Sequence, residues 1–125
     1  MKVVARLLDD LVTEMRRTAE TPSVDAVHDL RVSVRRATEG LRIFTPEAGR
    51  LRKEIKAIRE RAAAVRDRDV TRQLLRRHRL PAMDPASVYL QGQRDLAASQ
   101  LRVFLESLLR KDRPARWRRW IGEDE

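Results

Sequence analysis

The sequence predicts an all-α fold: a single antiparallel bundle of four long or medium helices followed by a short C-terminal helix. Apolar residues recur three and four positions apart along most of the chain, and no long stretch alternates with period two. The pairs Thr21-Pro22 and Thr45-Pro46 divide this pattern into segments of helix length. The chain has 125 residues, of which 42% are hydrophobic, and this supports one core of modest size.

The first two helices are expected over residues 2–20 and 24–44, with Ser23 as the N-cap of the second. The apolar stripe of the first helix comprises Val4, Leu7, Leu8, Leu11 and Met15. That of the second comprises Val27, Leu30, Val34, Ala37, Leu41 and Phe44. Gly40 lowers the helix propensity of its segment, so it indicates either the close approach of a neighbour or a mild kink.

The third helix is expected to have Thr45 as its cap and Pro46 as its first residue. Its predicted buried residues are Leu51, Ile55, Ile58, Ala62 and Val65. The apolar pattern changes register at residues 66–69, which predicts a separate short helix carrying Val70, Leu74 and Leu75.

The loop signal LPAMDP separates that segment from a long helix, with Asp84 as the cap and Pro85 at the first position. Its predicted buried residues are Leu90, Ala97, Leu101, Phe104 and Leu108. A last short helix over residues 113–121 is expected to dock through Trp117, Trp120 and Ile121. The domain is therefore expected to span residues 1–122, with an acidic tail at 123–125.

The charge balance points to an anionic partner. The net charge of +9 and the pI near 11.2 favour nucleic acid, polyphosphate or an acidic membrane surface. All but four of the 28 cationic residues are Arg, whose planar fork matches phosphate oxygens two at a time. Aromatic residues make up only 4% of the chain, which leaves few rings to stack on unpaired bases.

Several classes of chemistry have no signal in the chain. There is no Cys, the two His stand fifty residues apart, and no phosphate loop, catalytic triad or zinc spacing occurs. Asp67 and Asp69 are interpreted as a helix cap and partners of nearby cations rather than as metal ligands. We therefore expect no enzyme, no metal and no cofactor. Asp9 and Asp10 interrupt the N-terminal apolar stretch and no run of 18 apolar residues exists, so a cytoplasmic protein away from membranes is expected.

Two rows of cations are the strongest functional signal. Spacings of three, four and seven put His28, Arg31, Arg35 and Arg42 on one face of their helix, and Arg52, Lys56, Arg59 and Arg66 on one face of the next. Neighbouring like charges repel by about 0.2–0.5 kcal/mol per pair, a cost that a bound polyanion reverses. The rows therefore predict a phosphate-binding surface.

The segments VHDLRVSVRRATEGLRIF and KAIRERAAAVRDRDV resemble the CHAD family, the conserved histidine α-helical domain. The matching positions are His28, Arg31-Val32, Arg35-Arg36, Leu41-Arg42, Phe44, Lys56, Arg66-Asp67 and Asp69-Val70. The resemblance implies a helical bundle that binds inorganic polyphosphate without catalysis and is often associated with polyphosphate granules. It implies phosphate contacts from His28, Arg31, Arg35, Arg36, Arg42, Lys56 and Arg66, and a structural role for both aspartates. The chain departs from the family pattern at Thr38, Ala57, Ala63 and Arg68.

The family usually has two similar bundles that face each other across a basic channel, and this sequence matches only the first. A symmetric homodimer is therefore expected to supply the second wall. Repulsion between two subunits of charge +9 makes this dimer dependent on salt or on the bound anion. Two alternatives to polyphosphate binding stay open: a nucleic-acid module that recognises an RNA backbone, and a protein-interaction domain for an acidic or granule-bound partner.

Overall fold

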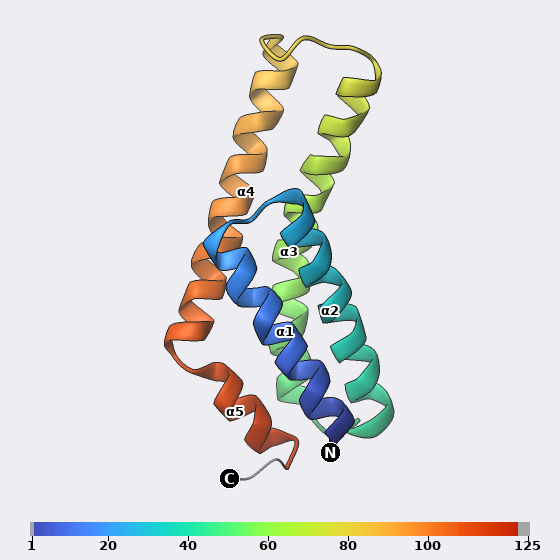
Figure 1. Ribbon diagram of the computed structural model, residues 1–125, viewed down its shortest axis with the longest axis vertical. Helices are drawn as coiled ribbons and strands as arrows, with labels where there is room; N and C mark the ends of the chain where they lie inside the picture. The colour runs from blue at the N-terminus through green and yellow to red at the C-terminus, as the bar shows by residue number, and fades with distance from the viewer. Residues whose placement is uncertain (1, 123–125) are drawn as a thin grey trace.

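The computed structural model describes residues 2–122 and consists of five α-helices over that range. They are α1 (Lys2–Glu20), α2 (Val24–Phe44), α3 (Gly49–Arg77), α4 (Pro85–Arg110) and α5 (Arg113–Trp120). The four long helices run up and down beside one another, and α5 lies below the C-terminal end of α4 (Figure 1). The predicted all-α bundle with a short C-terminal helix is confirmed.

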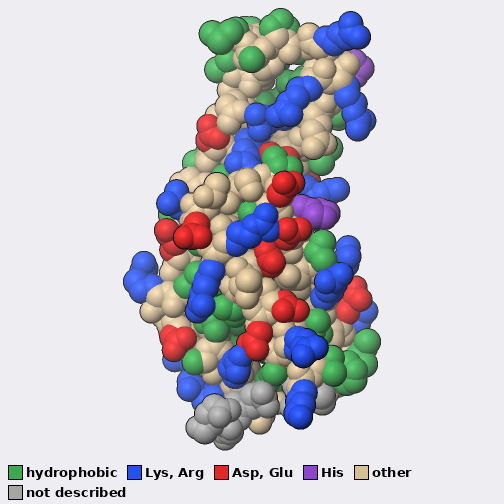
Figure 2. Space-filling model, in the orientation of Figure 1, with side chains coloured by type: hydrophobic (Ala, Val, Ile, Leu, Met, Phe, Trp, Pro, Cys, Tyr) green, Lys and Arg blue, Asp and Glu red, His purple; other side chains and the backbone are tan. Residues whose placement is uncertain are grey.

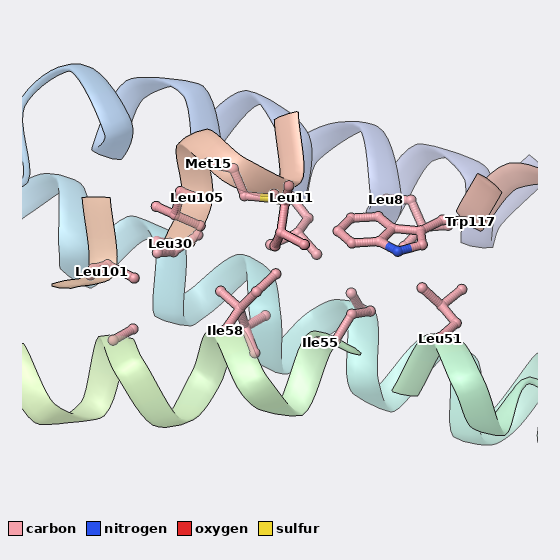
Figure 3. Close-up of a cluster of buried hydrophobic side chains, with 14 of the residues drawn as sticks. Leu8, Leu11, Met15, Leu30, Leu51, Ile55, Ile58, Leu101, Leu105 and Trp117 are labelled. Atoms are coloured by element: carbon pink, nitrogen blue, oxygen red, sulfur yellow. The ribbon is translucent and has the colours of Figure 1, made fainter. Parts of the chain in front are cut away.

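The core forms where the four long helices surround a common axis. α1 packs against α2 and α4, and α3 packs against the same two helices. Figure 3 shows Leu, Ile and Met side chains of these helices gathered along this axis, with Trp117 of α5 at one end of the cluster beside Leu8. The stripe predicted for the third helix is entirely inaccessible to solvent. Phe44 is the exception in α2, because it lies in the last turn and is 45% exposed.

Local sequence signals correctly predict most of the helix starts. Ser23 caps α2 by accepting a hydrogen bond from the Ala26 amide at 3.1 Å. Asp84 caps α4 in the same way, because its Oδ1 accepts a hydrogen bond from the Ala86 amide at 2.9 Å. The prediction of a close neighbour at Gly40 is also confirmed, since a Cβ atom there would lie 2.5 Å from Leu7 Cδ1 of α1.

The predicted start of the third helix is wrong. Thr45 ends α2 instead of capping α3, because its amide still donates to the Leu41 carbonyl at 2.8 Å. Pro46 therefore lies in the turn, and α3 begins at Gly49, after Ala48. No side chain caps this helix, and its first turn contains cations and no acid. The correction brings Arg50 and Lys53 to the start of α3.

The predicted separate short helix is also wrong, because α3 continues unbroken through residues 66–77. Between Arg50 and Arg79 the sequence contains no Gly or Pro, so no residue breaks the helix. The apolar pattern changes there because the surroundings change. The end of α3 and the start of α4 extend beyond the α1–α2 turn as a two-helix arm (Figure 1). No residue from 70 to 96 is buried.

A buried ion pair closes the core at the base of this arm. Arg94 of α4 donates from Nε to Asp69 Oδ1 at 2.9 Å and from Nη2 to the Pro22 carbonyl at 2.6 Å. Arg72 lies 3.7 Å from the same carboxylate. Asp69 is thus structural, as the family resemblance implies, but it lies inside α3 and is not a helix cap. The pair joins α3, α4 and the α1–α2 turn.

A second polar cluster docks α5. Trp117 is fully buried and donates from Nε1 to Glu54 of α3 at 3.0 Å, and Arg113 donates to both oxygens of the same carboxylate. Burial alone would raise the pKa of Glu54, but the hydrogen bonds from Arg113 and Trp117 outweigh it and hold that pKa below its usual value. The predicted docking of the last helix is confirmed for Trp117 and Ile121. The predicted acidic tail at 123–125 lies outside the described residues.

Candidate functional site

The two predicted cation rows lie on the edges along which α2 and α3 meet. Because α3 follows α2 after a short turn, the helices are antiparallel, and the end of one row lies beside the start of the other. Within a row, cations three or four residues apart stand about one helical turn, or roughly 5–6 Å, from each other, whereas Arg35 and Arg42, like Arg59 and Arg66, stand about two turns apart. We call this seam the α2–α3 groove; its residues are His28, Arg31, Arg35, Arg42, Arg52, Lys56, Arg59 and Arg66.

Near the α2–α3 turn the groove opens into a hollow of about 510 Å³. It is lined by Thr38, Gly49, Arg50, Arg52, Lys53, Lys56 and Arg59, and its lining includes no described acidic side chain. Arg50 and Lys53 were not among the predicted site residues. Their spacing could have revealed them, because Arg50, Lys53 and Lys56 follow one another at intervals of three residues. This turn hollow is the most strongly cationic part of the seam.

At the other end of the groove, near the arm, is a smaller hollow of about 180 Å³. Its lining combines predicted site residues with apolar and polar neighbours: Val24, Val27, His28, Arg31, Arg66, Asp69, Val70 and Gln73. His28 is exposed here and Arg31 is half-buried. The structure therefore brings together His28, Arg31 and Arg66, which come from both predicted rows.

Arg31 is electrostatically unsatisfied. Burial is the main cause that lowers the pKa of its guanidinium, repulsion from Arg66 and Arg35 adds to the effect, and Asp67 opposes it. Its Nε atom is buried and has no hydrogen-bond acceptor. A bound anion would cancel the repulsion and pair with the terminal nitrogens of the guanidinium, and it would reach the buried Nε only if the side chain moved.

Arg52 has a similar unsatisfied group at the opposite end of the groove. Its Nη2 donates to the Pro46 carbonyl at 2.8 Å, which holds the side chain beside the turn. Its Nε is buried without an acceptor. Each end of the groove thus contains a positioned guanidinium with a donor to spare.

Two predicted site residues differ from the others. Arg35 lies on the groove edge, but its Nε is 3.9 Å from Glu39 Oε1 and its side chain is 67% exposed, so this ion pair is weak. Arg36 lies on another face of α2.

The position of Arg36 follows from its helical neighbours. Asp29 and Gly40, seven residues before and four after it, share its face of α2. Asp29 binds Arg17 of α1, and Gly40 approaches Leu7 of α1. Arg36 is therefore on the α1 side of α2, and the structure does not bring it together with the groove cations.

The mix of acidic and basic side chains differs between the surface of α1 and the edge formed by α2 and α3. Over α1, Asp and Glu side chains lie among Lys and Arg, whereas Lys, Arg and His outnumber acids along the right-hand edge formed by α2 and the upper part of α3, where some acid is also visible (Figure 2). Glu39, Asp67 and Asp69 lie beside individual cations of the groove, so the surplus of positive charge is greatest in the turn hollow, whose lining includes no described acid. This arrangement attracts a polyanion.

Two features are absent from residues 2–122. None of the described helices is long and apolar enough to cross a membrane. No cluster of three or more His, Asp or Glu side chains placed to hold a metal ion occurs in this range.

The family model of the CHAD domain matches residues 2–125, so the chain belongs to the CHAD family. CHAD domains are in general binding domains related to polyphosphate rather than catalytic ones. Comparison with curated proteins and with solved structures gave no match.

Proposed function

We propose that this chain binds inorganic polyphosphate along the α2–α3 groove and carries out no catalysis of its own. The observation that carries the proposal is the pair of cation rows along one seam, with an unsatisfied, buried Nε atom at each end. A linear chain of phosphates would pair with terminal guanidinium nitrogens at both ends of the groove and offset the repulsion within each row. Such binding would direct the protein to polyphosphate granules in the cytoplasm.

The lining of the groove favours phosphate chains over nucleic acid. Neither hollow along the seam is lined by a Phe, Tyr or Trp side chain that could stack on a base. The cations within each row stand one or two helical turns apart, which suits a repeating charge but provides no set of donors and acceptors for base edges. The proposed ligand is therefore recognised by its charge and spacing.

Competition between polymers tests this proposal. Long-chain polyphosphate is expected to displace labelled duplex RNA at equal phosphate concentration near physiological salt, in a fluorescence anisotropy assay. The logarithm of the binding constant should fall linearly with that of salt concentration, with a slope of about −0.7 per phosphate neutralised. RNA that binds as tightly as polyphosphate, or more tightly, would contradict the proposal and favour the nucleic-acid alternative.

The groove is open to solvent on its outer side, where Lys56, Arg59 and Arg66 are exposed. We propose that a second copy, related by a two-fold axis, covers a bound chain with its own groove. Light scattering is expected to give a monomer at low salt without ligand and a dimer after addition of polyphosphate, because the anion cancels the repulsion between the grooves. A monomer at saturating polyphosphate would rule out this arrangement.

The exposed imidazole of His28 is expected to make binding pH-dependent. It lies with Arg31 of α2 and with Arg66 and Asp69 of α3 at the arm end of the groove. A bound polyanion favours the imidazolium, so binding should tighten as the pH falls from 7.5 to 6. His28→Gln is expected to flatten this profile, while His78→Gln, outside the groove, should leave it unchanged. An unchanged profile in His28→Gln would remove His28 from the site.

A further inference from the structure

A separate pocket of about 490 Å³ lies on the other side of α3, where α3, α4 and α5 meet. We call it the α3–α5 pocket. Its lining residues divide into a cationic group, an apolar and aromatic group, and one carboxylate, Glu54. Its size falls within the range of small-molecule sites, about 300–1,000 Å³.

The cationic group comprises Arg50, Lys53, Lys111 and Arg116, together with Arg113. No ion pair joins the first four to an acid within residues 2–122. Glu54 does not neutralise them, because its two oxygens already accept hydrogen bonds from Arg113 and Trp117. The pocket thus has a surplus of positive charge and can accept an anion without breaking an internal ion pair.

The remaining wall is apolar, which a phosphate chain alone does not need. It is formed by Ala57, Phe104, Leu108 and Trp120. The guanidinium of Arg61 already covers the Phe104 ring at 3.9 Å from its centroid. Trp120 is only partly buried, and the Arg113 guanidinium lies farther away, at 5.6 Å from the ring centroid. Of the two aromatic rings, Trp120 is therefore the one with a surface available to a ligand. Ala57 contributes only a methyl group to this wall.

We propose that the α3–α5 pocket binds a nucleoside di- or triphosphate. The base packs against Trp120 and the apolar wall, while the phosphates contact Arg50 and Lys53 at one edge and Lys111 and Arg116 at the other. This ligand class combines a planar ring with a short phosphate chain, as the two halves of the pocket require. The proposal does not depend on polyphosphate binding in the groove.

Arg50 and Lys53 also line the turn hollow of the α2–α3 groove. The two sites therefore share a cationic edge around the start of α3. A nucleotide bound in the pocket competes with the end of a polyphosphate chain for these two side chains. We expect partial competition, with polyphosphate binding weakened but not abolished at saturating nucleotide.

Intrinsic fluorescence gives a direct test with the full chain. Trp117 is fully buried, so quenching by a base reports on Trp120. ATP is expected to quench saturably and to bind at least tenfold more tightly than tripolyphosphate or adenosine. Tripolyphosphate that binds as tightly as ATP would overturn the proposal and leave the pocket as an extension of the phosphate track. An absence of saturable binding by calorimetry would also overturn it.

Variants separate the pocket from the groove. Ala57→Phe fills the pocket without changing charge, and Lys111→Glu with Arg116→Glu removes two proposed phosphate contacts. Each is expected to weaken ATP binding at least tenfold, measured by calorimetry. Arg6→Glu with Arg16→Glu, which makes the same charge change on exposed positions of α1, should have less than a threefold effect.

Circular dichroism and thermal unfolding establish that each variant is folded. ATP binding that survives both pocket variants in folded protein would overturn the pocket assignment while leaving the groove proposal intact. Conversely, loss of polyphosphate binding in the wild type would not affect the pocket test, because ATP and polyphosphate are measured separately.

Discussion

Reversing two groove charges, Arg59→Glu with Arg66→Glu, is expected to weaken polyphosphate binding about 100-fold. Both side chains are exposed, so their replacement should leave the fold intact. Each charge-assisted hydrogen bond to phosphate contributes about 1.5 kcal/mol or more, and two of them correspond to about two decades in the dissociation constant. The salt dependence should also weaken by about 1.4 in slope, since two fewer counterions are released.

The control for this experiment is Arg6→Glu with Arg16→Glu, which changes the net charge equally on the exposed surface of α1. It is expected to reduce affinity less than fivefold, because those residues act only through the long-range field. Equal losses in the two double variants would mean that net charge, rather than the groove, determines binding. Anisotropy titrations at two salt concentrations distinguish these outcomes.

Replacing Asp69 by Ala is expected to destabilise the fold by about 3–5 kcal/mol, because it leaves the charge of Arg94 buried without its partner. The Arg94 side chain is only 12% exposed, and its remaining acceptor is the Pro22 carbonyl. Urea denaturation followed by circular dichroism measures the loss.

Two further variants isolate the buried pair. Arg94→Met combined with Asp69→Ala should cost less than the sum of the single changes, because no uncompensated charge then stays inside. Glu106→Ala breaks the surface pair with Arg102, in which both side chains are about half exposed, and should cost less than about 0.5 kcal/mol. A cost for Asp69→Ala as small as that of Glu106→Ala would show that water already solvates Arg94.

Several parts of the fold follow from local sequence. Ser23 and Asp84 cap their helices because a side-chain oxygen beside the first turn needs no distant partner. The stripe from Leu51 to Val65 is buried as its period predicts, since a helix with one apolar face has only one way to hide it. The cation rows on α2 and α3 were predictable for the same reason.

The errors have a common physical cause: they concern positions where the surroundings, rather than the local residues, decide. Thr45 and Pro46 carry a helix-start signal, yet the amide of Thr45 completes a hydrogen bond of the preceding helix. The change of pattern after Arg66 resembles a helix end, but it marks the point where α3 leaves the four-helix core and continues in the arm. The burial of α3 therefore changes along its length, while its backbone stays helical.

The sequence by itself determined the helical class, the identity of the cations and their arrangement in two rows, because these depend on residue type and on the fixed period of a helix. The tertiary structure decided that the two rows lie along one seam, because α2 packs against α3. It placed Arg36 on the α1 side and joined Arg50 and Lys53 to the groove. It also built the α3–α5 pocket from residues up to 70 positions apart, which only the packing of α5 against α3 brings together.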